Sequence, residues 1–237
     1  MKPALVCLVI VAACAPARSD TILVSAASSL TDVFAAMETA YEEVTPGADV
    51  VINLGGSSAL RTQIMEGAPA DVFASADGEI MSDVVSAGMV SGGPRVFATN
   101  GLAIAVPPGN PAGVKGLADF GNGALYIGLC APEVPCGRFA RMALAAAGVT
   151  PSPDTEEPDV RSLLTKIEVG ELDAGIVYRT DVVAADGRVD SMVVPGRFDV
   201  SAAYPIAALD REGEGFVAFV LSPSGRAILR RFGFGLP

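Results

Sequence analysis

Short apolar runs alternate along this chain with segments whose apolar residues recur every three or four positions. In the first part, the runs at 22–24, 50–54 and 71–74 predict buried strands, and the helical spacing that begins at Leu30 and at Leu60 predicts helices between them. Ser29, with Asp32 three positions later, resembles a capping box, which places the start of the first helix at Ser29. The order strand, helix, strand, helix, strand predicts a parallel sheet with helices on its faces.

The same alternation starts again after residue 100. We expect strands at 102–106, 125–128, 174–178 and 204–209, and helices at 137–148, 159–170, 215–221 and 223–233. No tandem repeat or low-complexity linker interrupts the pattern. The fold class is therefore α/β, with two lobes joined by strands that cross near residues 98 and 200. We predict that residues 20–98 and 200–237 form lobe one and that residues 99–199 form lobe two.

Residues 1–19 have the features of a signal peptide. Met1-Lys2 supplies a positive start, and the apolar run at 4–13 is too short to span a bilayer. Ala15-Pro16-Ala17 or Ala17-Arg18-Ser19 offers a small-residue cleavage site. We therefore expect export to the periplasm. Residues 11–14 also resemble a lipobox, which would leave a lipid anchor on Cys14, although only six residues then separate Cys14 from the first strand at Thr21. Mass spectrometry of the mature N-terminus distinguishes the two outcomes.

The charge of the chain excludes several kinds of partner. There are 27 acidic and 16 basic residues, a net charge of −11, and removing Lys2 and Arg18 with the leader makes it −13. Such acidity argues against binding to nucleic acid or to anionic membrane surfaces. Any anion that this protein binds must be held by local dipoles, against the mean field of the protein.

Cysteine usage agrees with export. Cys7 and Cys14 lie in the leader, which leaves Cys130 and Cys136 as the pair in the folded part. In an oxidising compartment, two cysteines in one loop are candidates for a disulfide, and two unpaired buried thiols are the alternative. Their spacing does not fit a thioredoxin-type motif, and two thiols alone cannot complete a structural zinc site.

Four short segments place small or hydroxyl-bearing residues where a predicted strand gives way to a helix: 26–29, 55–58, 135–137 and 158–160. A helix start exposes unpaired N–H groups and a partial positive charge, so each segment is a candidate anion site. Ser29 and Ser57 also suit the simpler role of helix N-caps. Because both follow buried strands, at the edge where open α/β sheets bind ligands, we interpret them as binding residues.

The remaining candidates are neutral as well. Tyr178 ends an apolar strand, where it is either an ordinary strand tyrosine or a hydroxyl donor to the same crevice. Cys136 and Val160 can offer an oxyanion only their backbone N–H groups. The chain contains no histidine, no phosphate-loop motif and no Gly-x-Ser-x-Gly elbow, so we expect neither an enzyme nor a cofactor.

At these residues the chain resembles the periplasmic molybdate-binding proteins of ABC importers, a type II solute-binding protein family. The resemblance covers nearly the whole mature chain. It is carried by the segments 26–30, 56–76, 134–137, 159–161, 175–178 and 204–205. Within the second of these, Gly-Ala-Pro-Ala-Asp-Val-Phe at 67–73 is shared with other oxyanion-binding proteins.

The resemblance implies a type II periplasmic-binding fold, in which two lobes close over a tetrahedral oxyanion such as molybdate or tungstate. It assigns the anion to the hydroxyls of Ser29, Ser57 and Tyr178 and to the backbone amides of Cys136 and Val160. It also implies a membrane permease as partner of a monomeric binding protein. Two departures follow from the residues present. A disulfide to Cys130 would pin the loop that presents the Cys136 amide, and the pair 55–56 puts glycine where serine is common, which would loosen that turn.

Three rival hypotheses remain. The same fold could bind another oxyanion, such as sulfate or phosphate. A secreted enzyme could use Ser57 as a nucleophile, although no base accompanies it. A receptor or scaffold lobe could leave the cleft empty.

Overall fold

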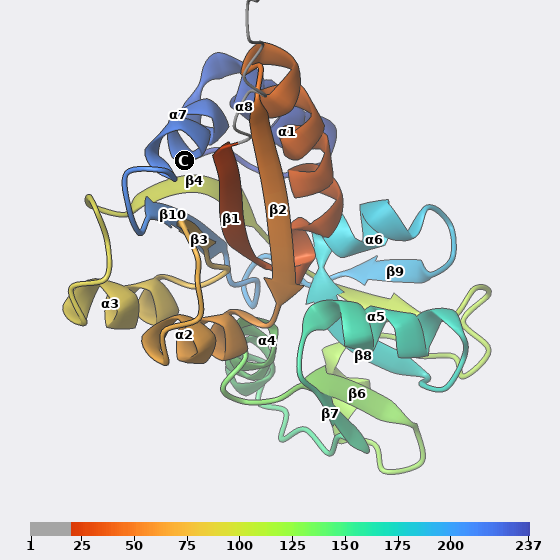
Figure 1. The fold of residues 1–237 in the computed structure, drawn as a ribbon. Coiled ribbons are helices and arrows are strands. Elements are labelled where there is room, and N and C mark those ends of the chain that lie inside the picture. The colour runs from red at the N-terminus through yellow and green to blue at the C-terminus, as the bar shows by residue number, and fades with distance from the viewer. Residues whose placement is uncertain (1–19) are drawn as a thin grey trace, which may run out of the picture.

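The computed structural model describes residues 20–237, so the expected signal peptide, Cys7 and Cys14 lie outside the described residues. Two five-stranded sheets form the centres of two lobes, with helices packed on the sheet faces (Figure 1). The predicted α/β class with two lobes is confirmed. Across residues 20–237, no helix is both long enough and apolar enough to cross a membrane.

The first lobe is a mixed sheet in the order β2-β1-β3-β10-β4. β1 pairs in parallel with β2 and β3, and β10 runs antiparallel to β3 and β4. The strands are β1 (Asp20–Ala27), β2 (Ala48–Gly55), β3 (Val72–Ala74), β4 (Arg95–Asn100) and β10 (Ala202–Ala208). The helices are α1 (Thr31–Val44), α2 (Ser57–Met65), α3 (Gly78–Ser86), α7 (Glu214–Leu221) and α8 (Pro223–Arg231), with a 3-10 turn at Ser28–Leu30.

An aromatic cluster fixes the helices of this lobe to the sheet. Phe34 of α1 lies 5.9 Å from both Phe97 of β4 and Phe216 of α7, measured between ring centroids. Phe97 in turn packs edge-to-face against Tyr204 of β10. The cluster therefore joins the N-terminal and C-terminal segments of the first lobe. It also places Tyr204 near Ser29, which follows the carboxyl end of β1.

The second lobe repeats the layout, in the order β7-β6-β8-β5-β9. β6 pairs in parallel with β7 and β8, and β5 runs antiparallel to β8 and β9. The strands are β5 (Leu102–Val106), β6 (Ile127–Cys130), β7 (Thr155–Glu157), β8 (Ala174–Tyr178) and β9 (Asp190–Val193). The helices are α4 (Pro135–Ala146), α5 (Val160–Glu168) and α6 (Arg179–Ala185), with a 3-10 turn at Leu117–Gly121.

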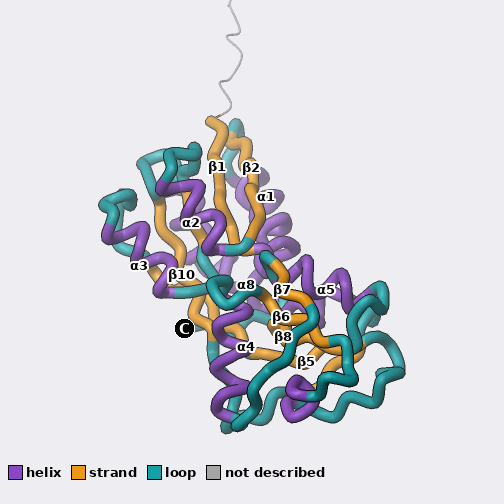
Figure 2. Tube along the Cα trace, turned by 90° about the horizontal axis from the view of Figure 1, so that it is seen from below, coloured by secondary structure: helices purple, strands orange, loops and turns teal. Residues whose placement is uncertain are grey.

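The chain passes between the lobes twice. Gly101 alone separates β4 of the first lobe from β5 of the second, and the segment between β9 and β10 makes the return. In Figure 1 the arrowhead of β2 points toward the second lobe, and Figure 2 shows α4 beside the strands of the second lobe. The carboxyl ends of the parallel strands thus face the space between the lobes. The residue boundaries 98/99 and 199/200 stay a prediction.

The predicted capping box at Ser29 is wrong. Residues Ser28–Leu30 form a 3-10 turn, and α1 begins at Thr31 without a side-chain cap. The Ser29 hydroxyl lies 3.0 Å from the hydroxyl of Tyr204, and Asp32 forms an ion pair with Arg161 of the other lobe. Both side chains are therefore occupied by distant partners, which a local motif cannot reveal.

Candidate functional site

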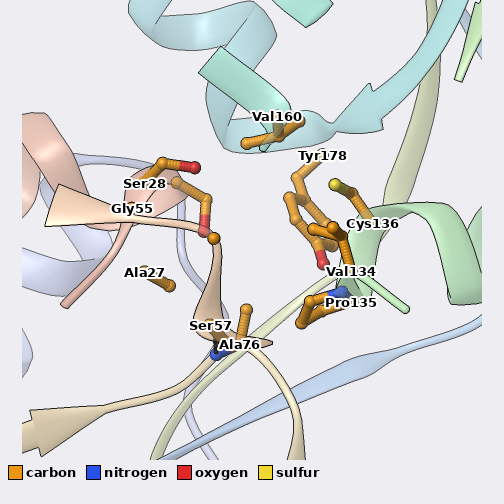
Figure 3. Close-up of a pocket in the computed structure, with 12 residues that line it drawn as sticks. Ala27, Ser28, Gly55, Ser57, Ala76, Val134, Pro135, Cys136, Val160 and Tyr178 are labelled. Carbon is orange, nitrogen blue, oxygen red and sulfur yellow. Dashed lines mark hydrogen bonds between the residues drawn. The ribbon is translucent and has the colours of Figure 1, made fainter. Parts of the chain in front are cut away.

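A small cavity lies between the two lobes and brings together the four predicted helix starts. It encloses about 190 Å³ of empty space, open solvent at its mouth included, which suits a small ion better than a drug-sized ligand. Figure 3 shows residues from the first lobe on one side and residues from the second on the other. The lining residues are Ala27, Ser28, Ser29, Gly55, Gly56, Ser57, Ala76, Val134, Pro135, Cys136, Val160 and Tyr178. All five sequence-predicted residues are among them, and none of the lining side chains carries a charge.

On the side of the first lobe, two serine hydroxyls are oriented by distant partners. The Ser57 oxygen accepts a hydrogen bond of 3.0 Å from the backbone N–H of Ala76, and the Ser29 oxygen is bonded to Tyr204. Neither serine caps its helix, since Gly56 is the N-cap of α2 and neither hydroxyl bonds to a helix-start N–H. The simpler N-cap interpretation therefore does not hold for Ser29 or Ser57. With its oxygen accepting from Ala76, the Ser57 hydroxyl still has its own proton to donate.

On the side of the second lobe, two helices start at the cavity. Pro135 occupies the first turn of α4, where the missing N–H of proline costs nothing, and Cys136 follows it. The Asp159 side chain caps α5 by accepting from the N–H groups of Arg161 and Ser162. Val160, one position earlier, lines the cavity. Because the first N–H groups of a helix have no partner within it, these turns offer backbone donors to an anion.

Tyr178 supplies the third hydroxyl. It is the last residue of β8, its side chain is fully buried, and its hydroxyl oxygen has no hydrogen-bond partner within the described structure. Burial raises the pKa of the Tyr178 hydroxyl well above its ordinary value, so this group stays protonated. A buried donor without a partner is costly unless a ligand satisfies it. This geometry favours the interpretation of Tyr178 as a ligand donor.

The structure contains a disulfide between Cys130 and Cys136, so the alternative of two free thiols does not hold. The loop that it closes is also held by other bonds: the Ala131 N–H donates to Glu157, and Arg141 donates to the carbonyl of Cys130. The disulfide is therefore one of several restraints on the turn that carries the Cys136 amide.

Charged side chains surround the cavity without lining it, and they link the lobes. Arg138 of α4 contacts Asp77 of the first lobe at 2.5 Å, and Arg161 of α5 pairs with Asp32 of α1. Gly56 lies so close to the Pro158 carbonyl of the other lobe that a Cβ atom at this position would overlap it. This close approach gives a physical reason for the glycine at position 56.

A buried carboxylate lies behind the site. Asp181 accepts a 3.0 Å hydrogen bond from the backbone N–H of Tyr178, and its second oxygen lies 3.6 Å from Nε of Arg161. Burial raises the pKa of Asp181 to about 7, and the Arg161 charge offsets part of that rise. Sequence reasoning missed this residue, because nothing local distinguishes it from a surface aspartate at a helix start.

Sequence reasoning also left out Ser28 and Ala76, which line the cavity, and the roles of Tyr204 and Asn100 behind it. Ser28 was visible as the neighbour of Ser29. Ala76 and Tyr204 lie in segments that carry the family resemblance, but nothing assigned them a place at the site, and no local signal marked Asn100. Within residues 20–237 there is no group of three or more histidine, cysteine or acidic side chains that could hold a metal ion.

Comparison with known proteins agrees with this geometry. Residues 22–235 match the family model described as bacterial extracellular solute-binding protein. The chain is 38% identical over 222 residues to the molybdate-binding protein ModA of Mycobacterium tuberculosis, covering 92% of this chain and 85% of that one. It is 31% identical over 243 residues to ModA of Escherichia coli, covering 94% and 92%.

Solved structures share the fold. The periplasmic molybdate-binding protein of Azotobacter vinelandii superposes with a TM-score of 0.79 at 22% identity, covering 91% of this chain and 99% of that one. The sulfate-binding protein SubI of Mycobacterium tuberculosis gives the same TM-score at 16% identity, covering 90% and 86%. The relatives of the present chain are solute-binding components of transporters. They bind a ligand, need no cofactor and are not enzymes. The chain therefore belongs to the bacterial extracellular solute-binding proteins, in the group of the periplasmic molybdate-binding proteins of ABC importers.

Proposed function

We propose that this protein captures molybdate, and with it tungstate, between its lobes and delivers the anion to the membrane permease of an ABC importer. In this proposal it is a monomer, exported to the periplasm by residues 1–19. The printed names of the curated relatives from Mycobacterium tuberculosis and Escherichia coli support molybdate as the ligand.

The observation that carries the proposal is a set of uncharged donors, drawn from both lobes, around one small cavity without a charged lining. Ser29 and Ser57 contribute hydroxyls from the first lobe, and Tyr178 contributes one from the second. The helix starts at Cys136 and Val160 add backbone N–H groups. Donors without a counter-charge suit a fully deprotonated oxyanion, because every one of its oxygens accepts.

The energies are sufficient for tight capture. Each hydrogen bond to a charged group contributes roughly 1.5–3 kcal/mol net, and each helix start adds roughly 0.3–1 kcal/mol. Five such bonds cover the roughly 8 kcal/mol of micromolar binding. These values are net of the hydrogen bonds to water that each group gives up, so much of the cost of removing the dianion from water is already included.

Sulfate or phosphate is the alternative ligand for the same fold. A sulfate-binding protein of Synechococcus elongatus is 22% identical over 249 residues. Sulfate has the same charge and shape as molybdate but is smaller, so cavity size is expected to separate the two. Phosphate carries a proton at neutral pH, and that proton would meet a second donor.

Titration calorimetry on the purified mature chain with molybdate, tungstate, sulfate and phosphate tests the proposal. Molybdate and tungstate should bind tightly and the other two weakly. Ser57→Ala should weaken molybdate binding by about 10- to 150-fold, the equivalent of one charge-assisted hydrogen bond. Ser58→Ala is the matched control, since Ser58 does not line the cavity. Tight sulfate binding without a molybdate signal would refute the assignment.

A further inference from the structure

The side chain of Arg161 lies between two carboxylates that belong to different lobes. It extends from the first turn of α5, where Asp159 accepts the backbone N–H of Arg161 and so fixes the base of the side chain. One terminal nitrogen of the guanidinium contacts Asp32 of α1 in the first lobe. Its Nε lies 3.6 Å from Oδ1 of Asp181 in the second lobe. Arg161 is therefore shared between the two lobes.

The contact between Arg161 and Asp181 is incomplete. Asp181 is fully buried, and its Oδ2 accepts a hydrogen bond from the backbone N–H of Tyr178. Its Oδ1 and the Nε of Arg161 are buried too, and neither has a hydrogen-bond partner within residues 20–237. Leaving buried charged groups without hydrogen bonds is costly, so these two atoms gain free energy if they close the gap between them.

The two carboxylates behave differently when the lobes separate. Asp181 and Arg161 belong to the same lobe and stay together, whereas Asp32 moves away with the first lobe. The Arg161 side chain has room to move, because it lines a groove of about 1050 Å³, open solvent included, together with Ser28 and Thr31. A shift of less than about 1 Å then brings Nε within hydrogen-bond distance of Asp181.

Arg138, the other arginine that links the lobes, differs in this respect. Its ion pairs within residues 20–237 are with Asp77 and Glu79, and both of these belong to the first lobe. Separation of the lobes breaks both pairs and leaves the buried Asp77 without its cation. At Arg161, in contrast, one ion pair can replace another.

We propose that Arg161 is a transferable latch: it pairs with Asp32 when the lobes are closed over the anion, and with Asp181 when they open. Asp181 thereby offsets part of the cost of breaking the contact with Asp32, and it sets how easily the closed protein releases its ligand. The inference rests on the proposed capture of an oxyanion between the lobes and adds the residues that regulate its release.

A simpler effect of Asp181 must be separated from this one. Asp181 is one hydrogen bond away from Tyr178, so its charge also repels a bound dianion, and Asp181→Asn tightens binding for either reason. A double-mutant cycle with Asp32→Asn separates the two effects. Without the Asp32 charge, Arg161 can pair with Asp181 in the closed and the open state alike. The latch therefore makes Asp181→Asn silent in that background, whereas direct repulsion acts in both backgrounds.

Molybdate calorimetry at about pH 8 on the wild type, Asp32→Asn, Asp181→Asn and the double variant tests the latch. This pH keeps Asp181 mostly ionised, because burial raises its pKa to about 7. Asp32→Asn should weaken binding about two- to fivefold, the range for a partly exposed ion pair, and Asp181→Asn should tighten it by a similar factor. The double variant should have the affinity of Asp32→Asn.

Asp83→Asn is the matched control. It removes a carboxylate of the first lobe that is about as exposed as Asp32, and its partner Arg61 belongs to the same lobe. The change in net charge is the same as in Asp32→Asn, but no contact between the lobes is lost. The affinity for molybdate should therefore stay at the wild-type value.

Two results would overturn the latch. Equal tightening by Asp181→Asn in both backgrounds would assign its whole effect to direct repulsion. A loss of affinity in Asp181→Asn would show that the carboxylate only supports the site around Tyr178. Should Asp181→Asn fail to fold, Asp181→Ser takes its place in the cycle, with the same expected pattern.

Failure of the proposed function gives different results. If the wild type binds sulfate and ignores molybdate, that function is refuted, and the same cycle with sulfate tests the latch. If the wild type binds neither anion, small-angle X-ray scattering of the ligand-free proteins decides. Asp32→Asn should then have a larger radius of gyration than Asp181→Asn, and equal radii would overturn the latch.

Discussion

Reducing the disulfide between Cys130 and Cys136 distinguishes two roles that this bond could have. It could restrict the unfolded chain, or it could order the native turn that carries the Cys136 amide. The other bonds to this loop, from Ala131 to Glu157 and from Arg141 to Cys130, favour the first role. We therefore expect reduction to lower stability while leaving anion affinity nearly intact.

The magnitude follows from the length of the closed loop. The two cysteines are 6 positions apart. For a loop of that size the chain-entropy relation gives about 2.3 kcal/mol of lost stability at 25 °C. In a protein of this size each kcal/mol shifts the melting temperature by roughly 2–4 °C, so the expected decrease is about 5–9 °C.

Thermal unfolding by circular dichroism, with and without dithiothreitol, measures the first effect, and calorimetry with molybdate measures the second. Reduction is the cleaner perturbation because it removes no side-chain atoms, and the double variant Cys130→Ala, Cys136→Ala serves as its non-reversible counterpart. Affinity should change by less than about fivefold, because the Cys136 N–H is a backbone group. A constant melting temperature together with a tenfold or greater loss of affinity would refute the reasoning and assign the bond to the native loop.

Three further predictions concern the approach of the lobes and the buried carboxylate. Gly56→Ala places a Cβ against the Pro158 carbonyl of the other lobe, so molybdate affinity should fall at least about tenfold without a loss of apo stability. Gly78→Ala, whose Cβ would meet nothing within 4 Å and which lies outside the cavity lining, should bind normally in calorimetry. Arg138→Gln removes the ion pair with buried Asp77 across the cleft, and stopped-flow release should be about three- to tenfold faster, with Arg188→Gln, whose partner Glu168 lies in the same lobe, as control. The pKa of Asp181 is about 7 in the folded protein, against 3.8 for an unperturbed aspartate. Between these pH values the native state therefore retains a proton that the unfolded chain releases. Stability should therefore decline as pH rises from about 4 to 7, by at most about 1.4 kcal/mol per pH unit, and Asp181→Asn should lose this slope in urea titrations.

Each of these outcomes has a clear opposite. Normal affinity in Gly56→Ala would mean that the ligand-bound lobes do not approach as closely as they do here. Unchanged release in Arg138→Gln would show that the ion pair contributes nothing to closure. A pH slope that persists in Asp181→Asn would assign the titration to another group.

The sequence predicted most elements whose pattern is purely local, although α3, which Asp77 caps and which buries Met81 and Val84, was missed. β1, β5 and β8 are apolar runs buried within their sheets, and α5 carries apolar residues on one face and ends before Gly170, whose φ is +74°. β7, in contrast, has the sequence Thr-Glu-Glu, and only its pairing with β6 makes it a strand. The exposed β9 and the short α6 were missed for the same reason: their signals come from neighbours in the fold.

The site was predictable to the same extent. Helix starts after buried strands indicated Ser29 and Ser57, and the end of an apolar strand indicated Tyr178. The helix starts at 135–137 and 158–160, together with the family resemblance, indicated Cys136 and Val160. The sequence could not show whether the serines cap helices, because the partner of Ser29 is 175 positions away and that of Ser57 is 19 positions away. Tyr204 and Asn100 meet only because β10 pairs with β4, so their role requires the folded sheet.

The division of the cavity between two bodies has a mechanical consequence. An ion bound there would itself hold the lobes together, since two of the five proposed donors belong to the first lobe and three to the second. Ligand affinity and closure of the lobes would then be coupled, because a small separation of the lobes would weaken all contacts between the ion and one lobe at once. A membrane partner that bound both lobes could release the ion by moving them apart, without a chemical change in any of the groups that bind the ion.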